Sequence, residues 1–427
     1  MKLRYALLII QLCLFPFLFL SCQGKVEEKG KTKIKVVHWW GNVRDQWQTL
    51  IDEFERTHPD IAVEQEIVTY GPYVSKVLAT AASGGIVGDV IVLEDWFAQE
   101  LLSRDYCVDL QPFVQKDLKV EDFFNVSFDE YRYNGQLLAI PACVGVGVLF
   151  YNKTLFDKAH MNYPDTTWTY DDLVATAKKL TRDTDGDGFV DQWGFTADDG
   201  MGFDTMLHSF GGAVLDNERR KSLLNDPKSL KAIRFWVDLV RKEKISPPSS
   251  MILGASTVGG IINPFLTGKF AMSVQPDFKL MYLEAPFEWD ITMPPKGPEN
   301  RRTMRFSQAF CIPRASIHRF EAWEFIRWFI TDAPLTGIDQ LFGGLTPVNR
   351  RRALSREFLE GLPRCNRRVV VDLMDNYSYS YMRTGWQEFR DHGFVPHLDL
   401  ALAGKESAET AAALGAKAVD DVLSRSK

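Results

Sequence analysis

The stretch TRDTDGDGFVDQWGF, residues 181–195, holds four aspartates within nine residues. Carboxylates this close repel one another unless water or a cation screens them. On the twelve-residue calcium loop of an EF-hand, five residues take positions one, three, five, seven and nine: Asp183, Asp185, Asp187, Phe189 (through its carbonyl) and Asp191. The spacing therefore suggests a structural Ca²⁺ site, and no other cofactor is indicated.

The same stretch departs from a calcium loop in two ways. Gly194 stands at position twelve, where a bidentate Glu is expected, and WGFTA reads as a strand rather than as a second helix. A calcium ion here would need water or a distant carboxylate to complete its shell. The alternative is a bare Asp/Gly turn that joins a helix over 169–181 to that strand, and the sequence leaves both interpretations open.

A second set of reactive side chains follows two predicted strands. KIKVVHWWG and DVIVLEDWF are short β-branched runs that end in aromatic and acidic residues. Helices alternate with these strands, which predicts an α/β unit with a largely parallel sheet. Ligands bind beyond the carboxyl ends of such strands. That rule selects Trp39, Trp40, Glu94, Asp95 and Trp96. Each tryptophan has core packing as its alternative role.

Other local signals place the surrounding elements. Residues 43–60 have helical spacing, with Trp47, Leu50, Ile51 and Phe54 on one face. Asn134-Gly135 predicts a hairpin turn. Thr169 is the expected N-cap of the helix that precedes the aspartates.

The N-terminus has the layout of an export signal. MKLR is basic, the run from Tyr5 to Leu20 is apolar, and Ser21 precedes Cys22. This resembles a bacterial lipobox, although Phe19 stands where Leu is usual. Residues 1–21 are then the signal peptide, and residues 22–32 are the lipidated cysteine with a flexible tether. Plain secretion and an uncleaved anchor are the alternatives.

Composition narrows the class of protein further. The chain of 427 residues is 45% hydrophobic, which is globular and long enough for two domains. A net charge of −6 gives no sign of nucleic-acid binding. Four cysteines remain outside the N-terminal segment, without metal-ligand spacing, and they permit either disulfides or buried thiols: Cys107, Cys143, Cys311 and Cys365.

Several segments, in this order and spacing, resemble the extracellular solute-binding proteins of ABC sugar importers, the family that includes maltose-binding protein. They include GDVIVLEDWFAQELLSRDYCVDLQPFVQKD, GQLLAIPACVGVGVLFYNKTLFDKA, TTWTYDDLVATAKKLTRDTDGDGFVDQWGF, FLTGKFAM, CIPRASIHRFEAWEFIRWFI and FGGLTPV. The resemblance covers essentially the whole chain after the signal.

The resemblance implies an α/β, two-lobed periplasmic-binding-protein fold (type II-like) with the ligand cleft between lobes joined by crossing strands. Lobe one takes 33–142 plus 303–345, and lobe two takes 143–302 plus 346–427. Hinge closure around a carbohydrate makes a surface for the ABC permease. The protein is then an exported monomer, lipid-anchored through Cys22 to the outer face of the cytoplasmic membrane, or in the periplasm or outer membrane.

The resemblance also implies further ligand contacts. Aromatic rings stack on sugar faces, and polar side chains bind the hydroxyls. Beside the strand-end residues, the candidates are Tyr70, Asp199, Met201, Asp277, Ser307, Gln308 and Trp386. Asp277 and Ser307 stand where relatives carry other residues, so their contacts depart from the family pattern.

Two other functions compete with transport. The same fold serves as a sensor or receptor lipoprotein, and a secreted glycoside hydrolase would use two carboxylates. No Gly-x-Ser-x-Gly, His-Glu-x-x-His or phosphate loop occurs in the chain. We therefore expect a binding protein and not an enzyme.

Overall fold

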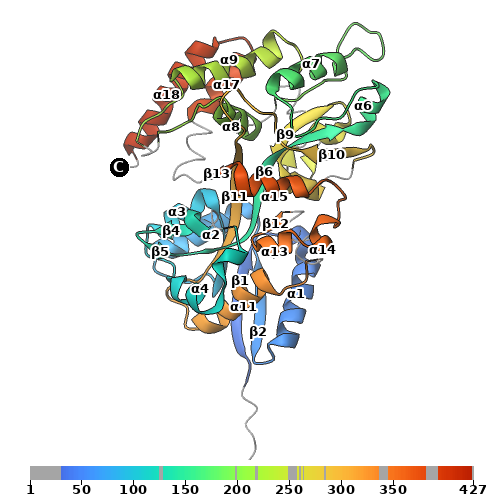
Figure 1. Ribbon diagram of the computed structural model, residues 1–427. Coiled ribbons are helices and arrows are strands. Elements are labelled where there is room, and N and C mark those ends of the chain that lie inside the picture. The colour runs from blue at the N-terminus through green and yellow to red at the C-terminus, as the bar shows by residue number, and fades with distance from the viewer. Residues whose placement is uncertain are drawn as a thin grey trace, which may run out of the picture.

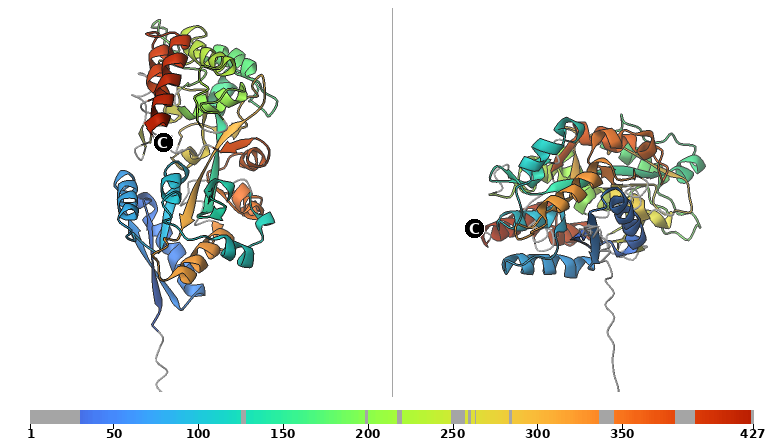
Figure 2. Two further views of the ribbon diagram at one scale, coloured as in Figure 1. Left: turned by 90° about the vertical axis from the view of Figure 1, so that its left-hand side faces the viewer. Right: turned by 90° about the horizontal axis from the view of Figure 1, so that it is seen from below.

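The computed structural model describes residues 30–124, 128–197, 200–216, 220–248, 257–258, 261–262, 264–282, 285–335, 345–380 and 393–425. Two lobes stack along the long axis of the molecule, and extended strands run between them (Figure 1, Figure 2). The expected two-lobed α/β fold is thereby confirmed. Within the described residues, no helix is long and apolar enough to span a membrane.

The lower lobe of Figure 1 is built mainly from the first part of the chain. Its elements are β1 (Thr32–His38), α1 (Arg44–Thr57), β2 (Ile61–Ile67), α2 (Tyr70–Ala82), β3 (Val90–Glu94), α3 (Asp95–Leu102), α4 (Gln111–Asp117), β4 (Arg132–Tyr133), β5 (Gln136–Leu137) and α11 (Arg319–Thr331). β1 pairs in parallel with β2 and with β3, as the strand–helix alternation predicted. The carboxyl ends of these strands therefore meet at one edge.

Helix α1 shows why this lobe folds as it does. The four apolar residues predicted on one face are its buried residues: Trp47, Leu50, Ile51 and Phe54. Burying each of these side chains stabilises the folded state by about 2 kcal/mol. The predicted Asn134-Gly135 turn is also confirmed, because it joins β4 to β5 with both residues at positive φ.

Two strands connect the lobes, namely β6 (Ile140–Asn152) and β11 (Thr303–Cys311), and they pair antiparallel. All thirteen residues of β6 are buried. The first part of β6 also pairs with β12 (Thr346–Pro347), and its second part pairs with β9 (Met272–Pro276) and β10 (Trp289–Thr292). β11 pairs antiparallel with β3 and in parallel with β13 (Ser378–Ser380). One nine-stranded sheet thus extends through both lobes.

Helices cover the upper lobe. They are α6 (Lys153–Lys158), α7 (Tyr170–Leu180), α8 (Gly200–Ser209), α9 (Pro227–Arg241), α17 (Val395–Leu402) and α18 (Ala408–Arg425), and a short hairpin of β7 (Thr257–Val258) and β8 (Ile261–Ile262) accompanies them. Thr169 is the N-cap of α7 and forms a capping box with Asp172, as predicted. WGFTA forms only isolated bridges, such as Thr196 with Ser273 of β9.

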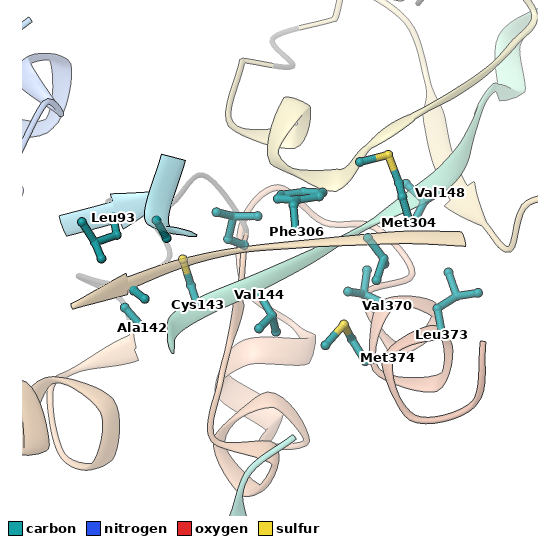
Figure 3. Packing of buried hydrophobic residues seen from close by; sticks show 14 of the residues in the cluster. Leu93, Ala142, Cys143, Val144, Val148, Met304, Phe306, Val370, Leu373 and Met374 are labelled. Carbon is teal, nitrogen blue, oxygen red and sulfur yellow. The ribbon is translucent and has the colours of Figure 1, made fainter. Parts of the chain in front are cut away.

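Helices α13 (Arg350–Ala353), α14 (Arg356–Leu359) and α15 (Arg368–Asn376) lie beside the crossing strands (Figure 1). Figure 3 shows Phe306 on one side of these strands and Val144, Val370 and Met374 on the other, so α15 packs beneath them. Arg352 donates to the Phe329 carbonyl of α11, so α13 contacts the lower lobe. The lobe boundaries drawn from the sequence stay a prediction.

Candidate ligand site at the strand edge of the lower lobe

The parallel strands place several of the predicted residues at one edge of the sheet. Trp39 directly follows β1, Glu94 ends β3, and Tyr70 begins α2. The Tyr70 hydroxyl donates to the Glu94 carboxylate. The Trp39 ring meets the Tyr70 ring edge-on, with 5.5 Å between centroids. Trp39 is half-buried and Tyr70 is 40% exposed, so this group borders solvent.

The crossing strand β11 adds an amide to this group. Gln308 lies opposite Glu94 of β3 on one side and opposite Cys143 of β6 on the other. Its Nε2 donates to Glu94 Oε1 at 3.2 Å, and its Oε1 accepts from Cys143 Sγ at 3.6 Å. We call Trp39, Tyr70, Glu94 and Gln308 the strand-edge cluster. All four were predicted as ligand residues, and the structure brings them together.

Trp40 has a different environment from Trp39. It is buried, and its ring stacks on Trp47 with 5.6 Å between centroids. Its backbone N–H donates to His38 Nδ1 at 3.2 Å. Burial lowers the pKa of His38 to about 4, which keeps this imidazole neutral as the acceptor. These contacts are those of a core residue. Trp96 lies in α3, but its side chain is outside the described part of the chain.

Ser307 belongs to a buried polar network. Its Oγ donates to Glu130 Oε2 at 2.6 Å and lies 2.9 Å from the Tyr131 hydroxyl. Arg305 Nε donates to Glu130 Oε1 at 2.7 Å, and Arg305 Nη1 donates to Ser378 Oγ at 2.9 Å. The network ties β11 to the 3₁₀ turn Asp129–Tyr131 and to β13. Ser307 is therefore fully engaged within the protein.

The charges of this network are withdrawn from water. The Arg305 and Glu130 side chains are 5% and 1% exposed. Burial raises the pKa of Glu130, while the Arg305 charge and the Ser307 and Arg305 hydrogen bonds oppose that rise. No sequence pattern pointed to Glu130 or Tyr131, because both lie about 175 residues from their partners.

Asp95 and Asp277 are the two buried carboxylates among the predicted residues. Asp95 begins α3 and is 5% exposed. Asp277 is fully buried at the start of a 3₁₀ helix, where Oδ1 accepts from the Val146 N–H at 3.2 Å. Burial raises the pKa of Asp277 well above its usual range. Among the described residues, its Oδ2 has no hydrogen-bond partner.

Gly145 leaves room for the Asp277 carboxylate beside β6. A Cβ at Gly145 would overlap both the Phe306 ring and the Asp277 carboxylate. Phe306 in turn meets Phe278 edge-on, with 5.5 Å between centroids. Asp277 is therefore placed against the crossing strands, on the upper-lobe side of the strand-edge cluster. Its neutral form would donate a hydrogen bond.

Three predicted ligand residues of the upper lobe remain. Asp199 and Trp386 lie outside the described residues, and Met201 is described only as part of helix α8. Helix α8 also carries a polar group that the sequence did not reveal. Asp204 is buried and accepts from the Tyr379 hydroxyl, and the His208 ring stacks on Tyr379 with 3.9 Å between centroids.

The aspartate-rich loop lies apart from this region, in the upper lobe. Ligand oxygens of Asp183, Asp185 and Asp187 lie within 4.8 Å of one another, and all three residues are exposed. Asp183 accepts from the backbone N–H of Gly188 at 2.8 Å and of Gly186 at 2.6 Å, which lowers its pKa. Three of the five predicted calcium ligands therefore converge.

The other two predicted ligands of the loop have contacts of their own. Asp191 accepts from the Thr184 N–H at 3.0 Å and from its hydroxyl at 2.6 Å. The Phe189 side chain is 76% exposed. Gly186 and Gly188 hold positive φ values of 80° and 91°, which glycine adopts without strain.

The four cysteines outside the N-terminal segment are free thiols, so the disulfides that the sequence also permitted are not formed among them.

Comparison with known proteins agrees with this architecture. A putative binding protein of Brucella abortus (strain 2308) is 22% identical over 372 residues, which cover 85% of this chain and 86% of that protein. The arabinooligosaccharide-binding protein of Bacillus subtilis (strain 168) is 23% identical over 254 residues, or 58% of this chain and 57% of that one.

Solved structures show the same fold. An ABC substrate-binding protein from Listeria monocytogenes in complex with cycloalternan superposes with a TM-score of 0.77 at 22% identity, and covers 93% of this chain and 99% of that one. UgpB from Mycobacterium tuberculosis in complex with glycerophosphocholine gives a TM-score of 0.76 at 19% identity, covering 93% and 100%.

Two lobes joined by crossing strands define a class of substrate-binding proteins. Residues 40–334 match the family described as bacterial extracellular solute-binding protein. Since this match spans more than half of the chain, the protein belongs to that family, whose members are exported binding proteins.

Proposed function

We propose that this protein is the substrate-binding component of an ABC importer, that it captures a sugar between its lobes, and that hinge closure presents the loaded protein to a permease. The strand-edge cluster carries the proposal. It combines a partly exposed aromatic surface with a carboxylate and an amide at the edge where α/β sheets bind ligands.

The chemistry of this cluster suits a sugar. The Trp39 and Tyr70 rings offer an apolar surface to the C–H face of a pyranose or furanose. Glu94 accepts from hydroxyls, and hydrogen bonds to a charged acceptor are stronger than neutral ones. Two of its donors, Tyr70 and Gln308, hold the carboxylate in place and can exchange for ligand hydroxyls. Asp277 would contribute from the upper-lobe side.

The named ligands of similar proteins support this class. Arabinooligosaccharide and cycloalternan are carbohydrates, whereas glycerophosphocholine is a charged phosphodiester. At the strand-edge cluster, the charged side chain is an acid, which disfavours a phosphate. We therefore favour a neutral mono- or oligosaccharide.

A thermal-shift screen tests the proposal. Neutral sugars are compared with glycerophosphocholine, and the matching sugar at 100-fold excess over its Kd should stabilise the protein by about 2.7 kcal/mol. Stabilisation by glycerophosphocholine alone would contradict the sugar assignment. Chromatography of the sugar after overnight incubation tests the expectation that the protein is not an enzyme, because any turnover would contradict it.

Anchoring and metal binding complete the proposal. Cys22 would carry the lipid that holds the monomer at the membrane, which mass spectrometry of the exported protein tests. Convergence of Asp183, Asp185 and Asp187 supports a structural Ca²⁺ that neutralises and stiffens the loop, away from the ligand. The ion would supply charge balance there and take no part in sugar binding.

A further inference from the structure

The end of the lower lobe opposite the strand-edge cluster carries two exposed apolar side chains. Ile317 is 87% exposed and Phe320 is 74% exposed. They flank the start of α11, three residues apart. Large apolar side chains grouped in this way on a surface mark an interaction site more often than single ones do.

Local structure does not account for these side chains. Ile317 directly precedes the N-cap residue His318, a position from which an apolar side chain usually packs back onto the first turns of the helix. Its exposure shows that this contact is not made. Phe320 meets the Phe113 ring only edge-on, with 5.8 Å between centroids. Both side chains therefore project into solvent.

A positive charge lies between them. The Arg319 guanidinium donates to the carbonyls of Ser316, at 3.0 Å, and of Arg314, which fixes its position. The described residues place no carboxylate within ion-pair distance of Arg319, whereas Arg314 pairs with Asp105 at 2.5 Å. We call Ile317, Arg319 and Phe320 the basal patch.

Hydrogen bonds locate the basal patch at the amino ends of the strands. Ser316 Oγ donates to Asp89 Oδ1 at 2.7 Å, and Asp89 Oδ2 accepts from the Lys35 N–H at 2.9 Å. Asp89 directly precedes β3, and Lys35 is the middle residue of β1, whose carboxyl end leads to Trp39. The basal patch and the strand-edge cluster therefore occupy opposite ends of the lower lobe.

The tether reaches the protein at the same end as the basal patch. The chain enters β1 at Thr32, ten residues after Cys22. The tether proposed for residues 22–32 would, as a flexible chain of about ten residues, span roughly 18 Å on average. A lipid on Cys22 would thus keep the basal patch close to the membrane at high effective concentration.

We propose that the basal patch docks on the lipid surface to which the protein is anchored. Ile317 and Phe320 enter the interface between headgroups and acyl chains, and Arg319 pairs with the phosphate of an anionic lipid. The inference rests on the lipid anchor of the proposed function. In this docked state the strand-edge cluster faces away from the bilayer, toward arriving solute.

Vesicle binding by the chain from residue 22, with Cys22→Ser to remove the lipid, tests this docking. The probe is vesicles of phosphatidylglycerol and phosphatidylcholine, separated by sedimentation. Ile317→Ser with Phe320→Ser should lower partitioning about tenfold, and Arg319→Gln about fivefold. Leu362→Ser removes an apolar side chain that is 75% exposed elsewhere, and should leave partitioning unchanged.

Three outcomes would overturn the proposal. In the first, the parent chain fails to bind vesicles, and in the second, the Leu362→Ser control loses as much vesicle binding as the patch variants. In the third outcome, ATP hydrolysis by the importer depends on the basal patch while vesicle binding is absent, which would make the permease the partner. Equal partitioning to pure phosphatidylcholine would contradict the role of Arg319. The sugar-induced thermal shift is measured on the same variants, so its failure would contradict the proposed sugar ligand independently of the vesicle result.

Discussion

Carboxylates occur in two contrasting settings in this molecule. On the loop of residues 183–191 they are close in sequence, exposed, and hydrogen-bonded to nearby backbone N–H groups. Around the crossing strands, Glu94 and Glu130 are half-buried or buried, and side chains far along the chain satisfy them. Aspartates that are close together in the sequence therefore form a turn, whereas the polar groups of the candidate site are brought together by tertiary structure.

The two settings also differ in their electrostatics. Backbone donors lower the pKa of Asp183, so its charge is well tolerated on the loop. Burial raises the pKa of Glu130 and of Asp277, so a charge there depends on a partner. Mutations at the crossing strands should consequently cost more stability than mutations of the loop.

The largest expected effect comes from the buried ion pair. Arg305→Met leaves Glu130 as an uncompensated buried charge, and should lower the free energy of unfolding by about 3–5 kcal/mol in urea denaturation. Arg314→Met removes an exposed pair with Asp105 and is the matched control, with an expected loss within about 1 kcal/mol. Equal losses would show that burial does not distinguish the two pairs.

Glu94→Gln tests the strand-edge cluster. It removes a charged acceptor and should weaken sugar binding by about 2 kcal/mol, roughly thirtyfold, as measured by calorimetry. Stability should change little, because Glu94 is only half-buried. Asp52→Gln on the exposed face of α1 should leave affinity unchanged. Unaltered affinity in Glu94→Gln would remove this carboxylate from the site.

His38 gives a pH dependence. Its pKa is about 4 in the folded protein, whereas a solvent-exposed histidine has a pKa of 6.5, so the unfolded chain binds the proton first and stability falls as pH drops below 6.5. The loss at pH 5 relative to pH 7.5 should be about 2 kcal/mol. His38→Asn keeps an acceptor for Trp40 and should flatten this part of the stability curve, and an unchanged curve would contradict the neutral imidazole.

Calcium should have the smallest effect. With an assumed Kd of about 0.1 mM, 1 mM Ca²⁺ should stabilise the protein by about 1.4 kcal/mol. Asp183→Asn should abolish the shift, whereas Asp171→Asn in the neighbouring helix should retain it. No shift in the parent protein would favour the bare Asp/Gly turn.

The features predicted correctly from the sequence are those that depend on residues close together in the chain. The buried face of α1, the Thr169 cap and the Asn134-Gly135 turn depend on neighbours a few residues away, and all are confirmed. The strand-end rule also placed Trp39 and Glu94 correctly at one sheet edge.

Partners distant in the chain were beyond sequence reasoning. Glu130 finds Arg305 only because β11 returns beside β3 and β6. Asp204 with Tyr379 likewise joins segments 175 residues apart. Such pairings depend on topology, which spacing does not encode.

The shared strand β6 has a consequence for biosynthesis. Its first part needs β11 as a partner, and β11 ends at Cys311. A ribosome or an export channel that releases the chain from its amino end therefore delivers β1, β2 and β3 long before the sheet of the lower lobe can be completed. Strands that lie far apart in the chain, such as β6 and β11, pair slowly. The part of the chain that is released first therefore stays incompletely folded, as passage through a narrow pore requires.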